Sequence, residues 1–544
     1  MKLNSRGRQA SLLAPTAALT GLVALLATGC ATPQKYANHR DLYAQGLYKE
    51  SIADFEAEMA KRQKKAGQDE NGEALPVPGS RDYALDDIEM GAGYRALVDL
   101  DSSNEAFERA EQGIREQQEA SLVGAAAGQV SAVFANDNVL PYQVQEYDGI
   151  MVNAYKAVNL LQQGETDKAR VEFKRVEERQ RMAAERFKEQ IAKAKEAEAK
   201  EPSADVAADA GSDGEAEEDG GIKAKIKALI AAKFKEAKDT ALGALQEGDN
   251  KSKLVEYEET FSADTWGAQE AFTNPFATYM HGVFLFAFGE DKSDAESAVH
   301  LFETACRVEP DPAKNPAAKA ISLATDDANG KLKKSAKDKT VFVVFENGLG
   351  PERQEYTIPL IIPLNMELNS DAKFVDATLK LPKLVTRPEA FPCLSVCDNG
   401  AELAKTATVC NMDAVVASEF RERMPAILLR NVLQTGVKGV LQVLIVNELG
   451  KQGIPRIAAS AAVSALFNLT KAADTRIWAS LPKNFQVAVV ERPDSGYLQL
   501  MAPGAPEPIG TAKIPEGGPA IVFVHTPAAA VPATVSVVSA AKTK

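Results

Sequence analysis

Hydrophobic positions recur every three or four residues over most of the first 330 residues, which is the spacing of one buried face on an α-helix. In this region one signature returns four times: a small residue, then an aromatic residue further along the helix, then often another small residue. The aromatic residues of the four copies are Phe55, Phe107, Phe173 and Phe302. A glycine such as Gly46 or Gly164 allows a tight turn between antiparallel helices, and the aromatic ring fills the gap between helix pairs. Because such hairpins cannot bury their faces alone, the pattern predicts that they stack.

The four copies predict a tetratricopeptide-like helical array in two parts, residues 30–200 and 222–330. The aromatic residues lie further apart than one repeat of about 34 residues, so insertions or unmarked helices must lie between the copies. An irregular all-helical bundle is the alternative. After the third copy, charges of alternating sign predict a long, solvated, coiled-coil-like helix that ends near residue 200.

The two parts of the array are separated by residues 201–221, which are almost wholly Ala, Asp, Glu, Gly, Ser and Pro. Such a composition cannot bury enough apolar surface to fold, so this segment is predicted to be a disordered acidic linker. Residues 222–240 follow, with lysines beside apolar positions, and they predict an amphipathic basic helix. This helix either packs on the array near the acidic linker or meets a membrane surface or an acidic partner.

The pattern changes at residue 340, where β-branched and alternating runs begin. Residues 340–345 and 355–364 flank a turn at 346–351, which predicts a β-hairpin. Further strands are predicted at 374–379, 485–491, 520–525 and 533–538, and helices at 412–446 and 456–469. Residues 338–544 are therefore predicted to form a β-sandwich-like domain with inserted helices, which makes the whole chain an α+β multidomain protein. Polar residues interrupt the apolar run 427–446 on one face, which favours a packed helix over a membrane span.

The first 29 residues have the order basic, apolar, small, which is typical of an export signal, and the apolar run is too short for a spanning helix that stays. A cysteine placed directly after Thr28 and Gly29 suits thioether attachment of a diacylglycerol. The segment resembles a bacterial lipoprotein signal, with Cys30 as the lipid attachment site. Ala31 then implies transfer to the outer membrane, facing the periplasm. Ordinary signal cleavage, which would leave Cys30 as a free thiol, is the alternative.

The chain of 544 residues has a formal net charge of -14, and removal of residues 1–29, with three positive charges and no negative ones, takes it to -17. An acidic surface of this size argues against a nucleic-acid partner and against an anionic bilayer face, so the membrane anchor must be the lipid. The four histidines are far apart in sequence. Neither a metal site nor a cofactor is therefore predicted.

The cysteines and one short segment are the remaining candidates for chemistry. In an oxidising periplasm, Cys393, Cys397 and Cys410 predict a structural disulfide whose pairing the spacing leaves open, whereas Cys306 is predicted to be a buried free thiol on a helix. An acid, a guanidinium and an indole come together in the segment with Asp474, Arg476 and Trp478. They predict either a buried ion pair with a stacked ring or an interaction patch.

Four stretches together resemble an uncharacterised family of bacterial outer-membrane lipoproteins with tetratricopeptide-like repeats. They are the segment ending at Cys30 and residues 153–160, 345–351 and 473–482. The resemblance implies a helical array followed by a mixed domain and carries no catalytic residues. It also implies companions among outer-membrane lipoproteins that activate peptidoglycan synthases.

No nucleophile motif, phosphate-binding glycine loop or His-Glu-x-x-His appears in the sequence, and histidine, the usual general base, is scarce. The leading hypothesis is a non-enzymatic envelope lipoprotein that binds envelope proteins or peptide segments as a scaffold, in cell-wall synthesis or outer-membrane assembly. One alternative is a peptidoglycan- or glycan-active enzyme whose site lies in the C-terminal domain. Another is a periplasmic accessory of a transport or secretion system.

Overall fold

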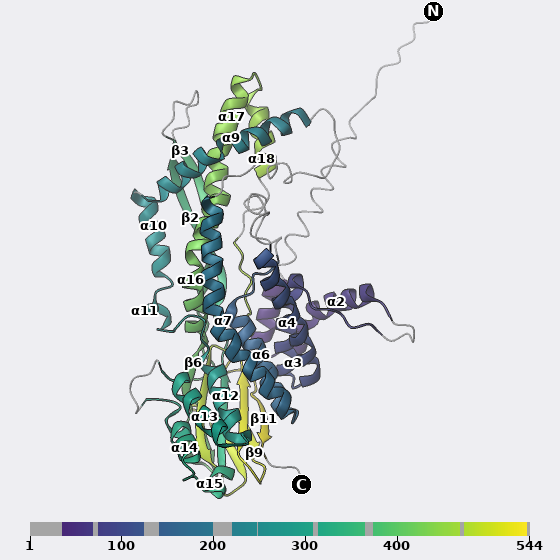
Figure 1. The fold of residues 1–544 in the computed structure, drawn as a ribbon, viewed down its shortest axis with the longest axis vertical. Helices are drawn as coiled ribbons and strands as arrows, with labels where there is room; N and C mark the ends of the chain where they lie inside the picture. Colours follow the sequence, from purple (N-terminus) through teal and green to yellow (C-terminus); the bar gives the residue numbers. More distant parts are fainter. Residues whose placement is uncertain are drawn as a thin grey trace, which may run out of the picture.

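A computed structural model describes most of the chain. The described residues are 35–68, 74–123, 141–199, 220–246, 248–307, 314–364, 374–467 and 473–540. The predicted leader, Cys30 and nearly all of the acidic linker 201–221 lie outside them. Helices and strands are both abundant, so the prediction of a mixed α and β chain is confirmed. Figure 1 shows helices and sheets packed into a body, from which a long arm of helices and a strand pair projects.

Each of the four sequence signatures lies on a helical hairpin. The pairs are residues 35–44 with α2 (Tyr48–Ala66), α3 (Ala84–Ala96) with α4 (Leu100–Val123), α6 (Glu146–Gln162) with α7 (Thr166–Ala199), and α12 (Pro275–Phe288) with α13 (Lys292–Ala305). The short helices η1 (Arg81–Tyr83), α14 (Ala318–Ala328) and α15 (Lys334–Asp338) complete this part, whereas the short helix α11 (Ala263–Trp266) lies beside the arm (Figure 1). The four signature aromatics are at most 1% exposed. Gly46 and Gly164 have φ of 77° and 78°, a left-handed conformation that favours glycine in such tight turns.

A small residue on the first helix of a pair is what lets the second helix approach. A Cβ atom on Gly91 of α3 would lie 2.6 Å from two ring carbons of Phe107 on α4. Gly282 of α12 faces Phe302 of α13 in the same way, at 2.9 Å. Gly91 and Gly282 are not residues of the predicted signature, and at these two positions the aromatic ring packs within a helix pair, whereas the prediction placed it between pairs.

Gly91→Ala is expected to destabilise the fold by about 1 to 3 kcal/mol, because the added methyl group overlaps the Phe107 ring and the closely packed helices must move apart. Urea unfolding measures the change. Gly243→Ala is the matched control, since Gly243 is also helical and a Cβ there meets nothing within 4 Å. This control should gain about 0.5 to 1 kcal/mol from helix propensity. Equal effects of the two substitutions would contradict the packing described here.

The first predicted strand lies at the centre of a five-stranded sheet. The strand order is β11 (Thr534–Ser539), β10 (Ala520–Thr526), β1 (Thr340–Asn347), β7 (Asn484–Glu491), β6 (Ala407–Asn411). β1 runs parallel to β10 and antiparallel to β7. The predicted hairpin between residues 340–345 and 355–364 is therefore wrong. Every residue of β1 is buried, so both faces of this strand are covered. β2 (Glu352–Pro363) has no buried residue before Ile358, alternates between buried and exposed residues from there on, and belongs to a different sheet.

Two different layers cover the two faces of this sheet. Alternate residues of β1, such as Val343, share a core with the four-stranded sheet β5 (Ala401–Lys405), β4 (Ser395–Asp398), β8 (Tyr497–Met501), β9 (Gly510–Lys513). The opposite face meets α12 and α13, where the ring centroids of Phe286 and Phe302 lie 5.6 and 6.4 Å from that of Phe342. The remaining predicted strands all appear, but β3 runs to Val385, well beyond its predicted end at residue 379, and strands β4, β5, β6, β8 and β9 were not predicted.

The arm is built on β2, which pairs over its whole length with β3 (Phe374–Val385). Along this pair runs one continuous helical rod: α16 (Met412–Val432), the π-helical turn η4 (Leu433–Val437) and α17 (Lys438–Lys451). A Cβ on Gly439 would lie 2.9 Å from a methyl of Val375, so the rod lies close against β3. The helices α9 (Gly220–Leu245), α10 (Gly248–Glu259) and α18 (Arg456–Phe467) complete the arm (Figure 1). Within the described residues, no helix combines the length and the apolar character that a membrane crossing needs.

The helical part and the mixed part share one hydrophobic core, although they occupy separate stretches of sequence. The rings of Phe276 and Phe485 stack with centroids 3.6 Å apart across this junction. A buried ion pair crosses it as well, with Arg95 Nη2 lying 2.7 Å from Glu346 Oε1. The two regions therefore meet through buried side chains, not only through the connecting chain.

Candidate functional site

A groove of about 500 Å³ lies on the helical part, between α4 and α7, with α6 at its base. Its lining residues are Asn104, Glu105, Glu108, Lys156, Leu160, Lys168, Val171, Glu172 and Arg175. Leu160 is partly buried and Val171 is 50% exposed, so apolar surface is open to a partner within a polar frame. The α4 side carries Glu105 and Glu108, whereas the α7 side exposes Lys168 and Arg175 and keeps its lining acid, Glu172, buried. The two walls of the groove are therefore of opposite charge.

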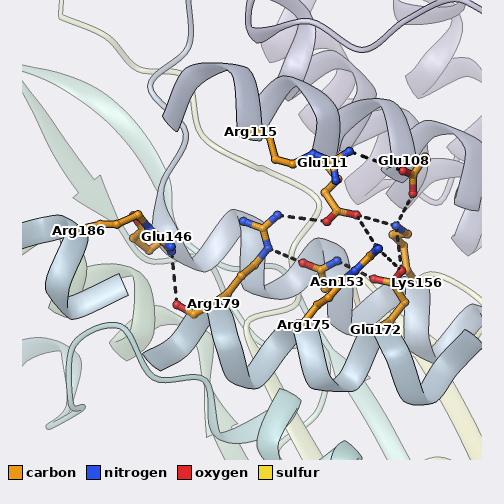
Figure 2. Close-up of polar contacts among 10 residues, drawn as sticks. All are labelled: Glu108, Glu111, Arg115, Glu146, Asn153, Lys156, Glu172, Arg175, Arg179 and Arg186. Atoms are coloured by element: carbon orange, nitrogen blue, oxygen red, sulfur yellow. Dashed lines mark hydrogen bonds and ion pairs between the residues drawn. The ribbon is translucent and has the colours of Figure 1, made fainter. Parts of the chain in front are cut away.

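The base of the groove is held by an ion network that centres on Lys156. The ammonium lies 2.5 Å from Glu108 Oε2, 2.7 Å from Glu111 Oε2 and 3.2 Å from Glu172 Oε1, although the lysine is only 5% exposed. Figure 2 shows these side chains converging from all three helices. Arg175 reinforces the network at 2.8 Å from Glu172. Because Lys156, Glu111 and Glu172 are buried and paired, they fix the spacing of the three helices, whereas Glu108 and Arg175 are more exposed.

The network also sets the protonation of its carboxylates. Burial raises the pKa of Glu111, but the neighbouring Lys156, Arg179 and Arg175 outweigh it and lower that pKa to about 2. Burial lowers the pKa of Lys156, and its carboxylate partners overcome this and hold it above its usual value. Glu111 and Lys156 therefore remain charged at neutral pH. The lining residues include no serine, cysteine or histidine.

The position of α6 is fixed from its N-terminus by the arm. The Glu419 carboxylate of α16 accepts hydrogen bonds from the backbone N–H groups of Glu146 and Tyr147, at 2.7 and 3.1 Å. A carboxylate is favoured there because the first N–H groups of a helix lack intrahelical partners. Asp148 lies beside this cap, where it accepts hydrogen bonds from the backbone N–H of Gln145 and the hydroxyl of Tyr142.

Asp148 makes stability depend on pH. Burial raises its pKa from 3.8 to about 7, so the folded state holds this proton more tightly than the unfolded state. The stabilising effect of that proton is complete below about pH 4 and is lost as the pH rises to 7, with a slope of at most about 1.4 kcal/mol per pH unit. Asp148→Asn should remove this slope and leave wild type relatively weaker above pH 7. Urea unfolding of both proteins from pH 4.5 to 8 measures it, and parallel profiles would contradict the assignment.

Asp474, Arg476 and Trp478 do not form an exposed patch. Arg476 is 8% exposed and its Nε lies 2.8 Å from Asp474 Oδ1, so the predicted ion pair is confirmed. Trp478 is 1% exposed, and its ring contacts Phe107 and Tyr155. The prediction of an interaction patch at this segment is wrong, because the body's core takes up the indole and the guanidinium has an internal partner.

The other predicted site residues have different outcomes. Cys393, Cys397 and Cys410 are free thiols in the structure, so the predicted disulfide is absent from it; Cys397 and Cys410 lie on strands of different sheets. Cys306 is a buried free thiol, as predicted, and burial raises its pKa to about 11. Cys30 lies outside the described residues. No cluster of His, Cys, Asp or Glu suited to a metal ion occurs among the residues described.

Sequence reasoning missed two groups of buried charges. One is the Lys156 network, since α7 was predicted to be a solvated helix and yet Glu172 is 6% exposed. The other is on α3, where Asp86, Asp87 and Glu89 are all buried. Glu89 accepts hydrogen bonds from the backbone N–H of Ala479, at 2.6 Å, and from the hydroxyl of Ser480. Three acids on an otherwise apolar helix were the signal that could have revealed the second group.

Comparison with known proteins gives no relative from which a function could be inferred. The sequence matches no protein-family model, and neither the curated proteins nor the solved structures contain a match. The resemblance to outer-membrane lipoproteins therefore stays a prediction. Any function must be argued from the groove and from the sequence.

Proposed function

We propose that this protein is a non-enzymatic lipoprotein of the bacterial envelope, which acts as an interaction scaffold. Cys30 carries the lipid, and the stacked hairpins form a tetratricopeptide-like array that stands in the periplasm beneath the outer membrane. The C-terminal region, in which two sheets share a core in a sandwich-like manner, supports the array. The partners are envelope proteins or peptide segments of cell-wall synthesis or outer-membrane assembly.

The observation that supports this proposal best is the groove between α4 and α7. It offers open apolar surface at Leu160 and Val171, and its base is preorganised by buried ion pairs that need not rearrange when a partner binds. Its opposite walls favour a segment with an apolar side chain at its centre, basic residues toward α4 and acidic residues toward α7. Amphipathic helices and short extended segments both have this character.

Binding is tested by substituting Val171, a groove residue whose half-exposed side chain is not part of the hydrophobic core. Val171→Asp places a charge on the open apolar surface, and Val255→Asp on α10 is the matched control, since Val255 is 44% exposed and far from the groove. Proteins retained from an envelope extract are quantified for wild type and both variants. We expect Val171→Asp to lose a defined partner by about tenfold or more while Val255→Asp retains it. Identical retained sets for all three proteins would overturn the groove as the binding site.

The lipid tether is tested separately in cells. Radiolabelled palmitate should enter the wild-type protein and not the Cys30→Ser variant, and only the wild type should sediment with outer membranes, because the acyl chains give stable anchoring. Unlabelled wild-type protein that remains in the cytoplasm would refute the envelope location.

A further inference from the structure

The arm concentrates positive charge in an otherwise acidic chain. α9, α17 and α18 together hold nine Lys or Arg residues and three Asp or Glu residues, a net charge of +6, whereas the whole chain has -14. α9 and α18 both pack against α17, in the part of the arm furthest from the five-stranded sheet (Figure 1). The net negative charge of the whole chain therefore does not oppose contact between this end of the molecule and an anionic bilayer.

A hollow of about 400 Å³ lies at this end, where α17 turns into α18. Its lining residues are Asn447, Gly450, Lys451, Gly453, Ile454, Pro455 and Arg456. The turn is sharp because Gly453 adopts a φ of 86°, and the N–H of Ile454 returns to the carbonyl of Leu449 at 3.1 Å. This turn brings the start of α18 beside the last residues of α17.

The hollow gathers hydrogen-bond donors suited to an anion. Lys451 and Arg456 supply two cations, although the Lys451 ammonium also lies 3.1 Å from Glu448 Oε2, and α18 begins at the hollow with N–H groups that have no intrahelical partner. Pro455 precedes that helix and has no side-chain acceptor that could cap them. Asn447 provides an independent indication of a ligand. Its side chain is 7% exposed, lines the hollow and has no hydrogen-bond partner among the residues that the structure describes.

An exposed apolar side chain beside these donors indicates whether the anion is a soluble one or part of a lipid. Ile457 follows Arg456 directly and is 87% exposed, the highest value among the exposed large hydrophobic side chains of the described residues. A soluble anion gains nothing from such a side chain, whereas a lipid bilayer offers phosphates at its surface and hydrocarbon just beneath them. We propose that the end of the arm binds an anionic bilayer, with a lipid phosphate in the hollow formed by Asn447, Lys451 and Arg456 and with Ile457 inserted among the acyl chains.

Sedimentation with vesicles tests this proposal on a chain that begins at residue 31, which lacks the leader and Cys30 but keeps every described residue. The vesicles contain phosphatidylcholine alone or with 30% phosphatidylglycerol. We expect binding only to the anionic vesicles, weakening as salt rises. Lys451→Ala with Arg456→Ala should weaken it by about tenfold or more, at roughly fivefold for each cation, and Ile457→Asp should weaken it further. The matched controls are Lys292→Ala with Lys334→Ala, whose side chains are 74% and 84% exposed on the body, and Leu403→Asp, 44% exposed on β5.

Each outcome bears on the proposal. Selective loss in the arm variants, with controls that bind like wild type, supports it. Equal binding by arm variants and controls overturns it, as does failure of the unsubstituted chain to sediment with anionic vesicles. Titration with inorganic phosphate separates the two sources of the anion. Saturable phosphate binding that requires Arg456, without vesicle binding, would overturn the assignment to a bilayer.

Discussion

Replacing Lys156 with methionine is expected to lower the free energy of unfolding by about 3 to 5 kcal/mol. Methionine keeps the length of the side chain but removes the charge, which leaves Glu111 and Glu172 buried without their shared cation. Arg175 and Arg179 compensate only in part, since Arg175 already pairs with both carboxylates and Arg179 with Glu111. Because α4, α6 and α7 meet at this lysine, we also expect the variant to lose binding in the groove. Urea unfolding at pH 7 measures the stability change.

Lys168→Met is the matched control for this substitution. Lys168 lines the same groove, but its side chain is 68% exposed and pairs with Glu165 on the surface, at 3.3 Å. Such a pair contributes at most about 1 kcal/mol, so the control should unfold almost like wild type. If Lys156→Met lowered the free energy of unfolding no more than Lys168→Met does, the ion network would not be what holds α4, α6 and α7 together.

Trp478→Ala is expected to cost about 3 to 5 kcal/mol of stability, because the indole is almost fully buried. Its N–H also donates to the Ser480 hydroxyl at 2.8 Å, and that hydroxyl donates to Glu89. Removal of the ring would therefore leave a cavity and disturb the buried junction between the helical and mixed parts. Thermal and urea unfolding should both report the loss.

Tyr497→Ala provides the comparison for an aromatic residue on the surface, since Tyr497 is 47% exposed on β8. It should change stability by less than about 1 kcal/mol. A Trp478→Ala protein with wild-type stability and lost partner binding would restore the interaction patch predicted from sequence and contradict the burial described here.

The helical hairpins could be predicted because their determinants are local. Gly164, Phe173 and their counterparts in the other copies act over a few turns of chain, and the structure places each copy on one hairpin. Strand pairing could not be predicted in the same way. The partners of β1 begin at Asn484 and Ala520, far along the chain. The turn directly after β1 therefore predicted the wrong partner strand. Local patterns identified most strands but not their neighbours.

The groove escaped sequence reasoning for a related reason. Glu108, Lys156 and Glu172 come from three helices, and each residue alone resembles an ordinary surface charge. Only the packing of α4 and α7 on α6 brings them together and buries them. By contrast, Asp474 and Arg476 are two residues apart, and their ion pair was predictable because the contact is local.

Photo-cross-linking from inside the groove tests the central claim most directly. A photoreactive phenylalanine analogue replaces Val171 in cells, and a second protein carries it at Val255 as the control. We expect irradiation to give a discrete adduct with an envelope protein from position 171 and none from 255. The adduct should disappear when Cys30→Ser prevents the protein from reaching the outer membrane. Irradiation that yields no adduct at 171, or the same adduct at both positions, would contradict a scaffold that binds its partner through this groove.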